Sequence, residues 1–226
     1  MTGPASAQGI TQQQGDEMLK ELRAIRLALE RVSPPPGTPV PEKRASLDDV
    51  RGPVMGKPDA PLTLVEFTDL QCPYCNRFTT TSFEQIKTAY IDTGKLRFVS
   101  RDFPLDFHPH AMAAAKAARC AGEQGKFWEM RLLLVRNASK LAPAFITSTA
   151  EGLKLDAKAF AACTASTRFD ADIKRDMDVA TKLGIEGTPS FVLGRTTPQG
   201  VDGVLVIGAQ PFQTFDAKIK ELLGAK

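Results

Sequence analysis

The sequence predicts an α/β protein with one additional helix ahead of its main domain, and three observations support this. An apolar run typical of a strand, residues 62–67, leads directly into two cysteines and a segment that favours a helix. The stretch from about 108 to 183 has helical composition. A glycine- and proline-containing turn then precedes a second strand-like run, residues 190–194. The expected order is strand–helix–strand, an inserted helical block, then strand–strand–helix.

Composition limits the possible partners. The chain has 226 residues, which fits one domain with an insertion or two small domains. Its hydrophobic content of 42% supports a sizeable core, and its net charge of +3 is close to balanced. Because the sequence contains no basic run, we expect no nucleic-acid partner. Its apolar stretches fall short of the ~18 residues that a membrane span needs.

The N-terminal region, residues 1–15, is rich in small and polar residues. Ala5-Ser6-Ala7 before Gln8 has the pattern of a signal-peptide cleavage site, but the charged and apolar regions that normally precede such a site are missing. The segment is therefore either a disordered tail or the remnant of a secretory signal.

Residues 16–32 are predicted to form an amphipathic oligomerisation helix that Asp16 caps. Its apolar residues repeat at spacings of four and three, as in a coiled coil: Met18, Leu22, Ile25, Leu29 and Val32. Leucine at one core position, with isoleucine at the other, favours a trimer or tetramer. The repeat covers only about two heptads, and the alternative is that the stripe folds back onto the main domain of the same chain.

A proline-rich linker, residues 33–46, is predicted next, since residues 33–41 contain five prolines and form an extended, stiff spacer. The main domain follows as residues 47–226. Its predicted strands are 62–68, 96–100, 190–194 and 203–207, and its predicted helices are 73–91, 109–121, 126–137, 143–152, 156–165, 169–183 and 211–223.

Cys72-Pro73-Tyr74-Cys75 is the most informative motif, because it lies where a strand meets a helix. Two cysteines at this spacing can open and close a disulfide, and a helix N-terminus stabilises the thiolate of the first. Half of a zinc site is the alternative, but zinc normally requires a second cysteine pair at matched spacing. The motif predicts redox chemistry, with no metal and no cofactor.

Three segments together resemble the DsbA-like thiol:disulfide oxidoreductases of the thioredoxin superfamily. They are Glu66-Phe67-Thr68-Asp69-Leu70-Gln71-Cys72-Pro73-Tyr74-Cys75, Arg101-Asp102-Phe103-Pro104 and Gly187-Thr188-Pro189-Ser190-Phe191. The resemblance runs from about Val54 to the C-terminus and implies a thioredoxin-like fold with an inserted helical domain.

The resemblance also implies roles for single residues. Pro189, after Thr188, would be cis and lie against the active-site disulfide; a trans proline that opens an edge strand is the alternative. Glu66 would be a buried acid that assists proton transfer near the second cysteine. Its apolar neighbours favour burial and a raised pKa over the alternative, an edge-strand glutamate that faces water.

We assign the nucleophile to Cys72, expected to be the more exposed sulfur, and the resolving thiol to Cys75, one turn into the helix. Pro73 and Tyr74 tune the pair. Tyr74 is neutral, whereas family members with histidine at this place are strong oxidants, so we expect a weaker oxidant.

Four cysteines permit three pairings. The motif favours a structural disulfide between Cys120 and Cys163, while two buried free thiols remain the alternative if the protein is not exported. His108 and His110 flank Pro109, and we expect Pro109 to open a helix rather than the histidines to bind a metal.

The resemblance implies a periplasmic or secreted enzyme that exchanges disulfides with cysteine-containing proteins and works with a membrane redox partner, a quinone-linked oxidase or a reductase. The direction stays open. The N-terminal helix and Thr188 favour an oligomeric isomerase or reductase, including copper-tolerance-type relatives. A non-enzymatic chaperone or scaffold is a further alternative, which a reactive Cys72 would argue against.

Overall fold

The computed structural model describes residues 11–32 and 43–224, which fall into two separate units. The first unit is helix α1 (Gln12–Val32) and the second is the main domain, which begins at Lys43. The predicted tail 1–10 and most of the predicted linker, residues 33–42, lie outside the described residues.

Helix α1 begins four residues before the predicted start, and its cap is Thr11 instead of Asp16. The Gln14 backbone N–H donates to Thr11 Oγ1 at 3.3 Å, and the Thr11 N–H donates to Gln14 Oε1 at 3.0 Å. This reciprocal pair is a capping box, in which glutamine takes the position more often held by glutamate. The prediction that Asp16 caps the helix is therefore wrong, because Thr11 already satisfies the free N–H group.

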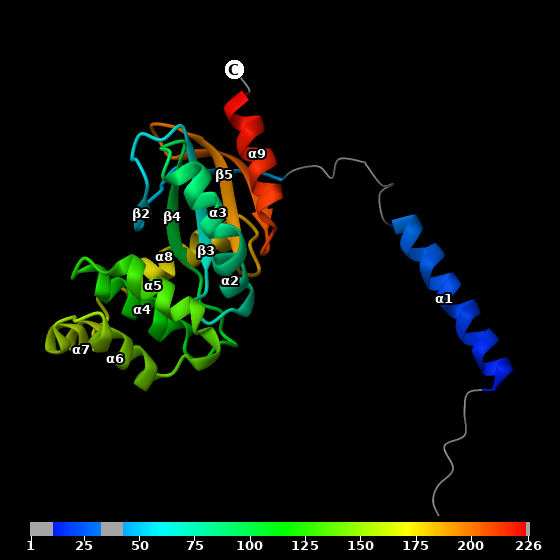
Figure 1. The fold of residues 1–226 in the computed structure, drawn as a ribbon, viewed down its shortest axis with the longest axis horizontal. Helices are drawn as coiled ribbons and strands as arrows, with labels where there is room; N and C mark the ends of the chain where they lie inside the picture. Colours follow the sequence, from blue (N-terminus) through cyan, green and yellow to red (C-terminus); the bar gives the residue numbers. More distant parts are fainter. Residues whose placement is uncertain (1–10, 33–42, 225–226) are drawn as a thin grey trace, which may run out of the picture. The chain divides into compact units, whose positions relative to one another are not determined.

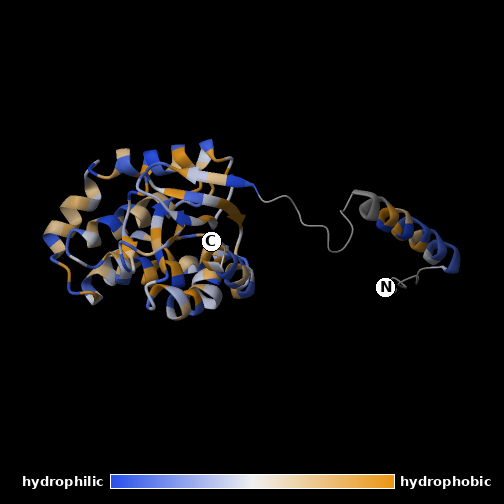
Figure 2. Ribbon diagram, turned by 90° about the horizontal axis from the view of Figure 1, so that it is seen from above, coloured by the Kyte–Doolittle hydropathy of each residue, from blue (hydrophilic) through white to orange (hydrophobic). Residues whose placement is uncertain are grey.

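The apolar stripe of α1 is exposed where its side chains are described. Met18, Leu22 and Ile25 are 54%, 57% and 53% exposed, and Figure 2 shows apolar and polar residues alternating along this helix. The side chains of Leu29 and Val32 fall outside what the structure describes.

The main domain keeps the predicted order of elements, with longer strands and two additional ones. Its strands are β1 (Arg44–Leu47), β2 (Val54–Met55), β3 (Leu62–Thr68), β4 (Leu96–Asp102), β5 (Ser190–Thr196) and β6 (Val201–Ile207). Its helices are α2 (Pro73–Phe78), η1 (Thr79–Phe83), α3 (Glu84–Ile86), η2 (Lys87–Ile91), α4 (Ala111–Gly122), α5 (Phe127–Arg136), η3 (Ala138–Lys140), α6 (Pro143–Gly152), α7 (Ala157–Ala165), α8 (Asp170–Lys182) and α9 (Phe212–Gly224). The predicted helix 73–91 is thus continuous but contains two stretches of π-type hydrogen bonding, η1 and η2.

Within the described residues, the strands form one six-stranded sheet in the order β1-β6-β5-β3-β4-β2 (Figure 1). Strands β3 and β4 run parallel, and the other neighbours run antiparallel. β3 therefore lies at the centre of the sheet, between β4 and β5. All seven of its residues are buried, as expected for a strand that is covered on both faces.

Two of the sheet's strands correct the predicted boundaries. β1 pairs with β6 from Arg44↔Val204 to Leu47↔Val201, so residues 44–46 belong to the main domain and not to the predicted linker. β2 adds a two-residue antiparallel pairing to the outer edge of β4. β1 alternates between exposed and buried residues, but at four residues it is too short for this pattern to stand out in the sequence, and β2 has only two residues.

The two faces of the sheet are covered by different helices. Leu62 and Leu64 of β3 pack with Phe78, Phe191 and Phe215 into a core beneath α2 to η2 and α9. On the other face, residues of β3, β4 and β5 pack against the end of α8. Helices α4 to α7 form the inserted block, which gathers beyond one end of the strands (Figure 1). Its apolar core also takes in Leu70, Cys72 and Cys75, so the motif cysteines pack against the insertion.

Helix α4 begins at Ala111, and His110 is its N-cap residue. The expectation that Pro109 is the first helical residue is therefore wrong by two positions. The helix is attached to the sheet by Arg119, whose Nε lies 2.5 Å from Asp102 Oδ2 and whose Nη2 lies 2.6 Å from Asp176 Oδ2. This buried ion cluster joins α4, β4 and α8.

Candidate active site

The motif cysteines lie at the start of α2, just beyond the end of β3. Cys72 is the N-cap residue, and Pro73 occupies the first helical position, where its missing N–H group costs no hydrogen bond. Both cysteines are free thiols and both are buried, Cys72 at 3% and Cys75 at 0% exposure. Cys72 is thus only marginally the more exposed residue, because the chain around Thr188 covers its sulfur.

The surroundings of Cys72 favour its thiolate and lower its pKa to about 6. The largest cause is a hydrogen bond with the Cys75 thiol, which outweighs the opposing effect of burial. The Thr188 side chain and the backbone N–H groups of Cys75 and Tyr74 lower the pKa further. The two N–H groups belong to the first turn of α2, whose hydrogen bonds are otherwise unfilled. The helix start therefore contributes as expected, but the partner cysteine contributes more.

Cys75 has the opposite character. Burial raises the pKa of its thiol well above the ordinary value, and its hydrogen bond to Cys72 and the nearby charges of Glu66 and Cys72 raise it further. The surroundings therefore favour the thiolate at Cys72 and the protonated thiol at Cys75.

A loop before β5 lies directly against Cys72. The Thr188–Pro189 peptide bond is cis, and Cys72 Sγ lies 3.4 Å from the Thr188 carbonyl oxygen. The adjacent cleft, of about 330 Å³, is lined by Tyr74, Arg77, Gly187, Thr188, Pro189, Ile207, Gly208 and Ala209. Tyr74 and Ile207 are 60% and 52% exposed, so the lining of this cleft is partly apolar.

Glu66 lies in the middle of β3, on the face that also carries Leu62, Leu64 and Thr68. It is fully buried in the centre of the sheet, so the alternative of an edge-strand glutamate that faces water is excluded. Burial raises the pKa of its carboxyl, and the guanidinium of Arg131 partly opposes the rise. Glu66 Oε2 pairs with Arg131 Nη2 in a short contact.

Arg131 is the residue that sequence reasoning missed. It is only 2% exposed and belongs to the buried face of α5, together with Phe127, Met130, Leu134 and Val135. The sequence carried a signal for its burial, because Arg131 lies three and four residues from apolar neighbours on one helix face. A buried arginine in turn requires an acidic partner.

Both histidines form hydrogen bonds near the active-site loop. His108 Nδ1 lies 2.8 Å from Asp69 Oδ2, and the His110 backbone N–H donates to Gln71 Oε1 at 2.7 Å. Asp69 also accepts from the backbone N–H groups of Gln71 and Leu105. These bonds fix the chain just ahead of Cys72. The described residues contain no group of three or more potential metal ligands.

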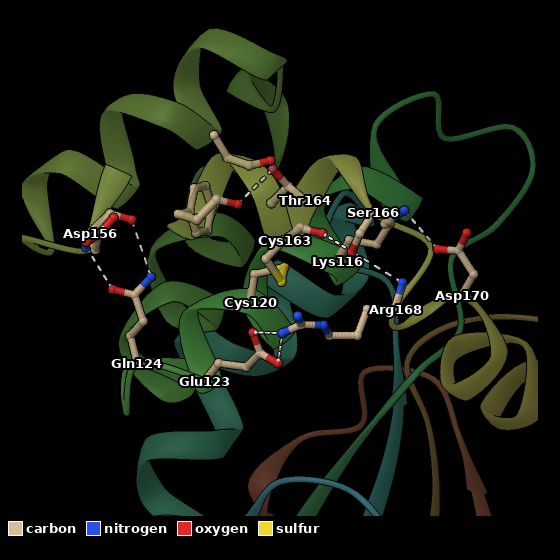
Figure 3. Close-up of a disulfide and its surroundings, with 12 residues drawn as sticks. Lys116, Cys120, Glu123, Gln124, Asp156, Cys163, Thr164, Ser166, Arg168 and Asp170 are labelled. Atoms are coloured by element: carbon tan, nitrogen blue, oxygen red, sulfur yellow. Dashed lines mark hydrogen bonds and ion pairs between the residues drawn. A yellow bond between two sulfur atoms is a disulfide. The ribbon is translucent and has the colours of Figure 1, made fainter. Parts of the chain in front are cut away.

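Cys120 of α4 and Cys163 of α7 form a disulfide (Figure 3). Polar contacts flank it between the same parts of the insertion: Gln124 Oε1 accepts from the Asp156 N–H at 2.7 Å, and Arg168 pairs with Glu123. Both half-cystines are buried. The bridge lies within the apolar core of the insertion, far along the chain from the motif.

Comparisons with known proteins agree with this geometry. The chain belongs to the thioredoxin family, whose model, described as Thioredoxin, matches residues 48–220. Among solved structures, alpha-DsbA1 of Wolbachia pipientis superimposes with a TM-score of 0.68 at 26% identity, covering 76% of this chain and 90% of that protein. BdbD of Bacillus subtilis superimposes with a TM-score of 0.67 at 22% identity, covering 80% and 97%. Within the thioredoxin superfamily the chain is therefore DsbA-like.

The curated relatives carry a different name. The Na(+)/H(+) antiporter NhaA 3 of Salinispora tropica is 35% identical over 170 residues, which are 75% of this chain and 26% of that protein. The chain thus spans about a quarter of the length of the curated relatives it matches. In the part of the chain that the structure describes, every helix is too short or too polar to cross a membrane.

Proposed function

We propose that this protein is a thiol:disulfide oxidoreductase that exchanges the Cys72–Cys75 disulfide or dithiol with cysteines of exported proteins. The observation that carries the proposal is the opposed character of the two thiols. The pKa of Cys72 is lowered to about 6 while burial raises that of Cys75. A thiolate that persists at neutral pH can attack a substrate disulfide, and a protonated neighbour can later resolve the mixed disulfide.

The cleft beside Cys72 fits a protein substrate. Tyr74 and Ile207 offer exposed apolar surface, and the carbonyl oxygen of Thr188 lies against the reactive sulfur. An extended segment that carries a cysteine can rest on this surface while its sulfur reaches Cys72. The protein would work in the periplasm or outside the cell, where disulfides persist, with a membrane redox partner that restores its starting state.

Trapping tests the roles of the two cysteines. Cys75→Ser is expected to accumulate mixed disulfides with substrate proteins, because the thiol that releases them is gone. Cys72→Ser should form none, since no activated thiolate remains. Non-reducing gels followed by mass spectrometry would show the adducts. Normal turnover by Cys75→Ser would mean that the roles are wrongly assigned.

An oligomeric isomerase or reductase is the second candidate, and the exposed stripe of α1 favours it. Met18, Leu22 and Ile25 are more than half exposed. Glu21 and Arg26 flank this stripe five residues apart, the spacing at which parallel helices of a coiled coil pair opposite charges. An assembly through residues 18–32, with a trimer favoured, would place several active sites around one substrate.

Light scattering on the full chain and on a variant that lacks residues 1–41 tests this candidate. An oligomer that becomes a monomer without the helix supports it, and two monomers at micromolar concentration contradict it. Two rates then give the direction of exchange. One is the rate at which the protein refolds scrambled ribonuclease, and the other is the rate at which it oxidises reduced ribonuclease.

A chaperone or scaffold without redox chemistry would not need an activated thiol. Alkylation of Cys72 at pH 5 separates it from an enzyme, because a thiol with a pKa of about 6 still reacts there through its thiolate fraction. A thiol that is inert at pH 5 would favour the scaffold.

A further inference from the structure

A buried polar cluster beneath Cys75 connects the sheet to the inserted helices. Glu66 of β3 is 0% exposed and Arg131 of α5 is 2% exposed. Arg131 Nε donates to Ser100 Oγ at 3.1 Å, and Ser100 lies directly opposite Glu66 in the pairing of β3 with β4. Burying these two charges has a large desolvation cost, which only good partners offset.

The guanidinium of Arg131 is held on several sides. Its central carbon lies 5.7 Å from the ring centre of Phe98 and 5.8 Å from that of Trp128. These aromatic faces favour a cation. With Ser100 and Glu66 as hydrogen-bond partners, the side chain has one fixed place, and it points from the insertion into the core of the sheet domain.

The two oxygens of Glu66 differ in their surroundings. Oε2 is committed to Arg131, whereas Oε1 is buried and, among the described residues, has no hydrogen-bond partner. Thr68 lies two residues further along the same strand face, and its buried hydroxyl also lacks a hydrogen bond within the described part of the chain. The Thr68 hydroxyl is still close enough to the Glu66 carboxyl and to the Cys75 thiol to favour the charged form of each. It therefore lowers the pKa of both groups.

We infer that Arg131 is a positioning residue for disulfide exchange: it holds Glu66 by one oxygen so that the other is free to exchange a proton with Cys75. This inference rests on the proposed function and assigns to the helical insertion a part in the chemistry. Without the arginine, a carboxyl buried this deeply would keep its own proton and could not accept another.

The proton and electron balance is complete within one resolving step. In a mixed disulfide of Cys72 with glutathione, the Cys75 thiol transfers its proton to the Glu66 carboxylate. The Cys75 sulfur attacks the Cys72 sulfur, the bond to glutathione breaks, and glutathione leaves as a thiolate with the electron pair. A Cys72–Cys75 disulfide forms. Reversing these steps describes the attack of a substrate thiolate on the oxidised protein.

The groups that act on Glu66 come from three places in the fold. Arg131 of α5 and the Cys72 thiolate at the start of α2 act on it as charges, and the Thr68 hydroxyl of its own strand acts as a polar neighbour. The protonated Cys75 thiol is the fourth group of this cluster. Because Arg131 supplies the only positive charge acting on Glu66 in this described cluster, its removal should change the proton acceptor more than it changes the Cys72 thiolate.

Oxidation of the reduced full-length protein by glutathione disulfide tests the inference, since it has two phases. The first, formation of the mixed disulfide, depends on Cys72; the second, its resolution, depends on Cys75. In Arg131→Met we expect the first phase to stay within about twofold of wild type. The second should be roughly tenfold slower at pH 7. The reason is that the pH at which the rate of this phase is half of its maximum, its pH midpoint, moves up by about one unit.

Arg136→Met is the matched control. Arg136 lies on the same helix and pairs with Glu84 at the surface, at 3.0 Å, with both side chains about half exposed. It should leave both phases and the pH midpoint unchanged. Arg131→Lys should restore part of the second phase. Glu66→Gln/Arg131→Met should be no slower in that phase than Glu66→Gln alone, because both changes act on one proton acceptor.

A folded Arg131→Met protein with the pH midpoint of wild type would overturn the inference. If that variant does not fold, Ser100→Ala takes its place, since it removes the acceptor of Arg131 Nε and keeps both charges. Its midpoint should move in the same direction by a smaller amount, and an unmoved midpoint would again overturn the inference. If wild type itself shows neither phase, the proposed function fails instead.

Discussion

The two cysteine pairs of this protein differ in sequence separation, in bonding and in the groups that surround them. Cys72 and Cys75 lie three residues apart where a strand ends and a helix begins, and both are free thiols. Cys120 and Cys163 are 43 residues apart on two helices and are bridged. The first sulfur of the motif meets unfilled N–H groups and an adjacent thiol, which favour its charge. The other pair is enclosed by apolar side chains and flanking polar contacts. Reactivity therefore follows from the helix start and its partner, not from burial, which both pairs share.

Replacement of cysteines should have the largest effect, because only changes in the motif pair are expected to abolish disulfide exchange. Cys72→Ser is expected to abolish exchange with a disulfide substrate, because its thiolate is the group that attacks. Cys120→Ala/Cys163→Ala should retain exchange within a few fold, since neither residue is among the groups that set the pKa of Cys72. Reduction of a fluorogenic disulfide substrate measures both. Loss of exchange in the double variant without unfolding would mean that the second pair takes part in the chemistry.

The same double variant should lower stability substantially. On the chain-entropy model, a bridge of this separation contributes at most about 4 kcal/mol. Urea unfolding of the double variant against wild type would measure the difference. Cys75→Ala is the matched control at the motif, where any bridge closes only a very short loop. A loss below about 1 kcal/mol in the double variant would show that the flanking contacts hold the insertion by themselves.

The pH dependence of stability should distinguish the redox states of the motif. The pKa of Cys72 in the folded, reduced protein is lowered to about 6 from the ordinary value of 9.0 for a cysteine thiol. The folded reduced protein therefore binds fewer protons than the unfolded chain between these values, and its stability rises with pH across this range. The stabilisation is complete above pH 9 and is lost as pH falls through 6. The oxidised protein has no such thiol.

Denaturant unfolding of both states from pH 5 to pH 9 checks this expectation. The reduced protein should gain stability relative to the oxidised protein as pH rises. An equal pH dependence in the two states would contradict the proposed activation of Cys72, whereas a steeper one would point to additional groups coupled to it.

The smallest expected effect is a change in reduction potential at Tyr74, which lies between the two motif cysteines in the sequence and lines the cleft. Tyr74 is 60% exposed and neutral. Tyr74→His places a group that can carry a positive charge beside the thiolate, which stabilises the reduced form and makes the protein more oxidising. An increase of about 30 mV in reduction potential corresponds to about 1.4 kcal/mol. Equilibration with glutathione buffers measures it. Tyr74→Phe serves as the control and should change the potential little.

Much of this architecture was readable from local sequence. Strand β3 and helix α6 have the predicted bounds, because an apolar strand run and a proline at a helix start are local signals. Edge strands β1 and β2 were missed, since each is short and gains its structure from a partner distant in sequence. The cap of α1 was placed on Asp16, although Thr11 and Gln14 carry the capping signature.

The sequence predicted which cysteines form the candidate site, but it predicted fewer of the residues that surround them. The positions of Cys72, Cys75 and the Thr188–Pro189 loop follow from motifs. The contact between Glu66 and Arg131 does not, because it joins β3 to a helix 65 residues further along the chain. Likewise, the mutual hydrogen bond that does most to lower the pKa of Cys72 depends on how the two thiols face each other. Both interactions arise from tertiary packing, and no fixed sequence spacing predicts which two groups will meet.

The pairing of β1 with β6 has a consequence for synthesis of the chain on the ribosome. The first strand of the main domain is completed only by its last strand, and central β3 receives its partner β5 only after the whole insertion has been made. These contacts have high sequence separation, which delays their formation. The insertion, by contrast, is continuous in sequence, so the Cys120–Cys163 bridge joins residues that are all made before β5 and β6. The Thr188 loop that lies against Cys72 directly precedes β5, so the surroundings of Cys72 are complete only once this late part of the chain has been made.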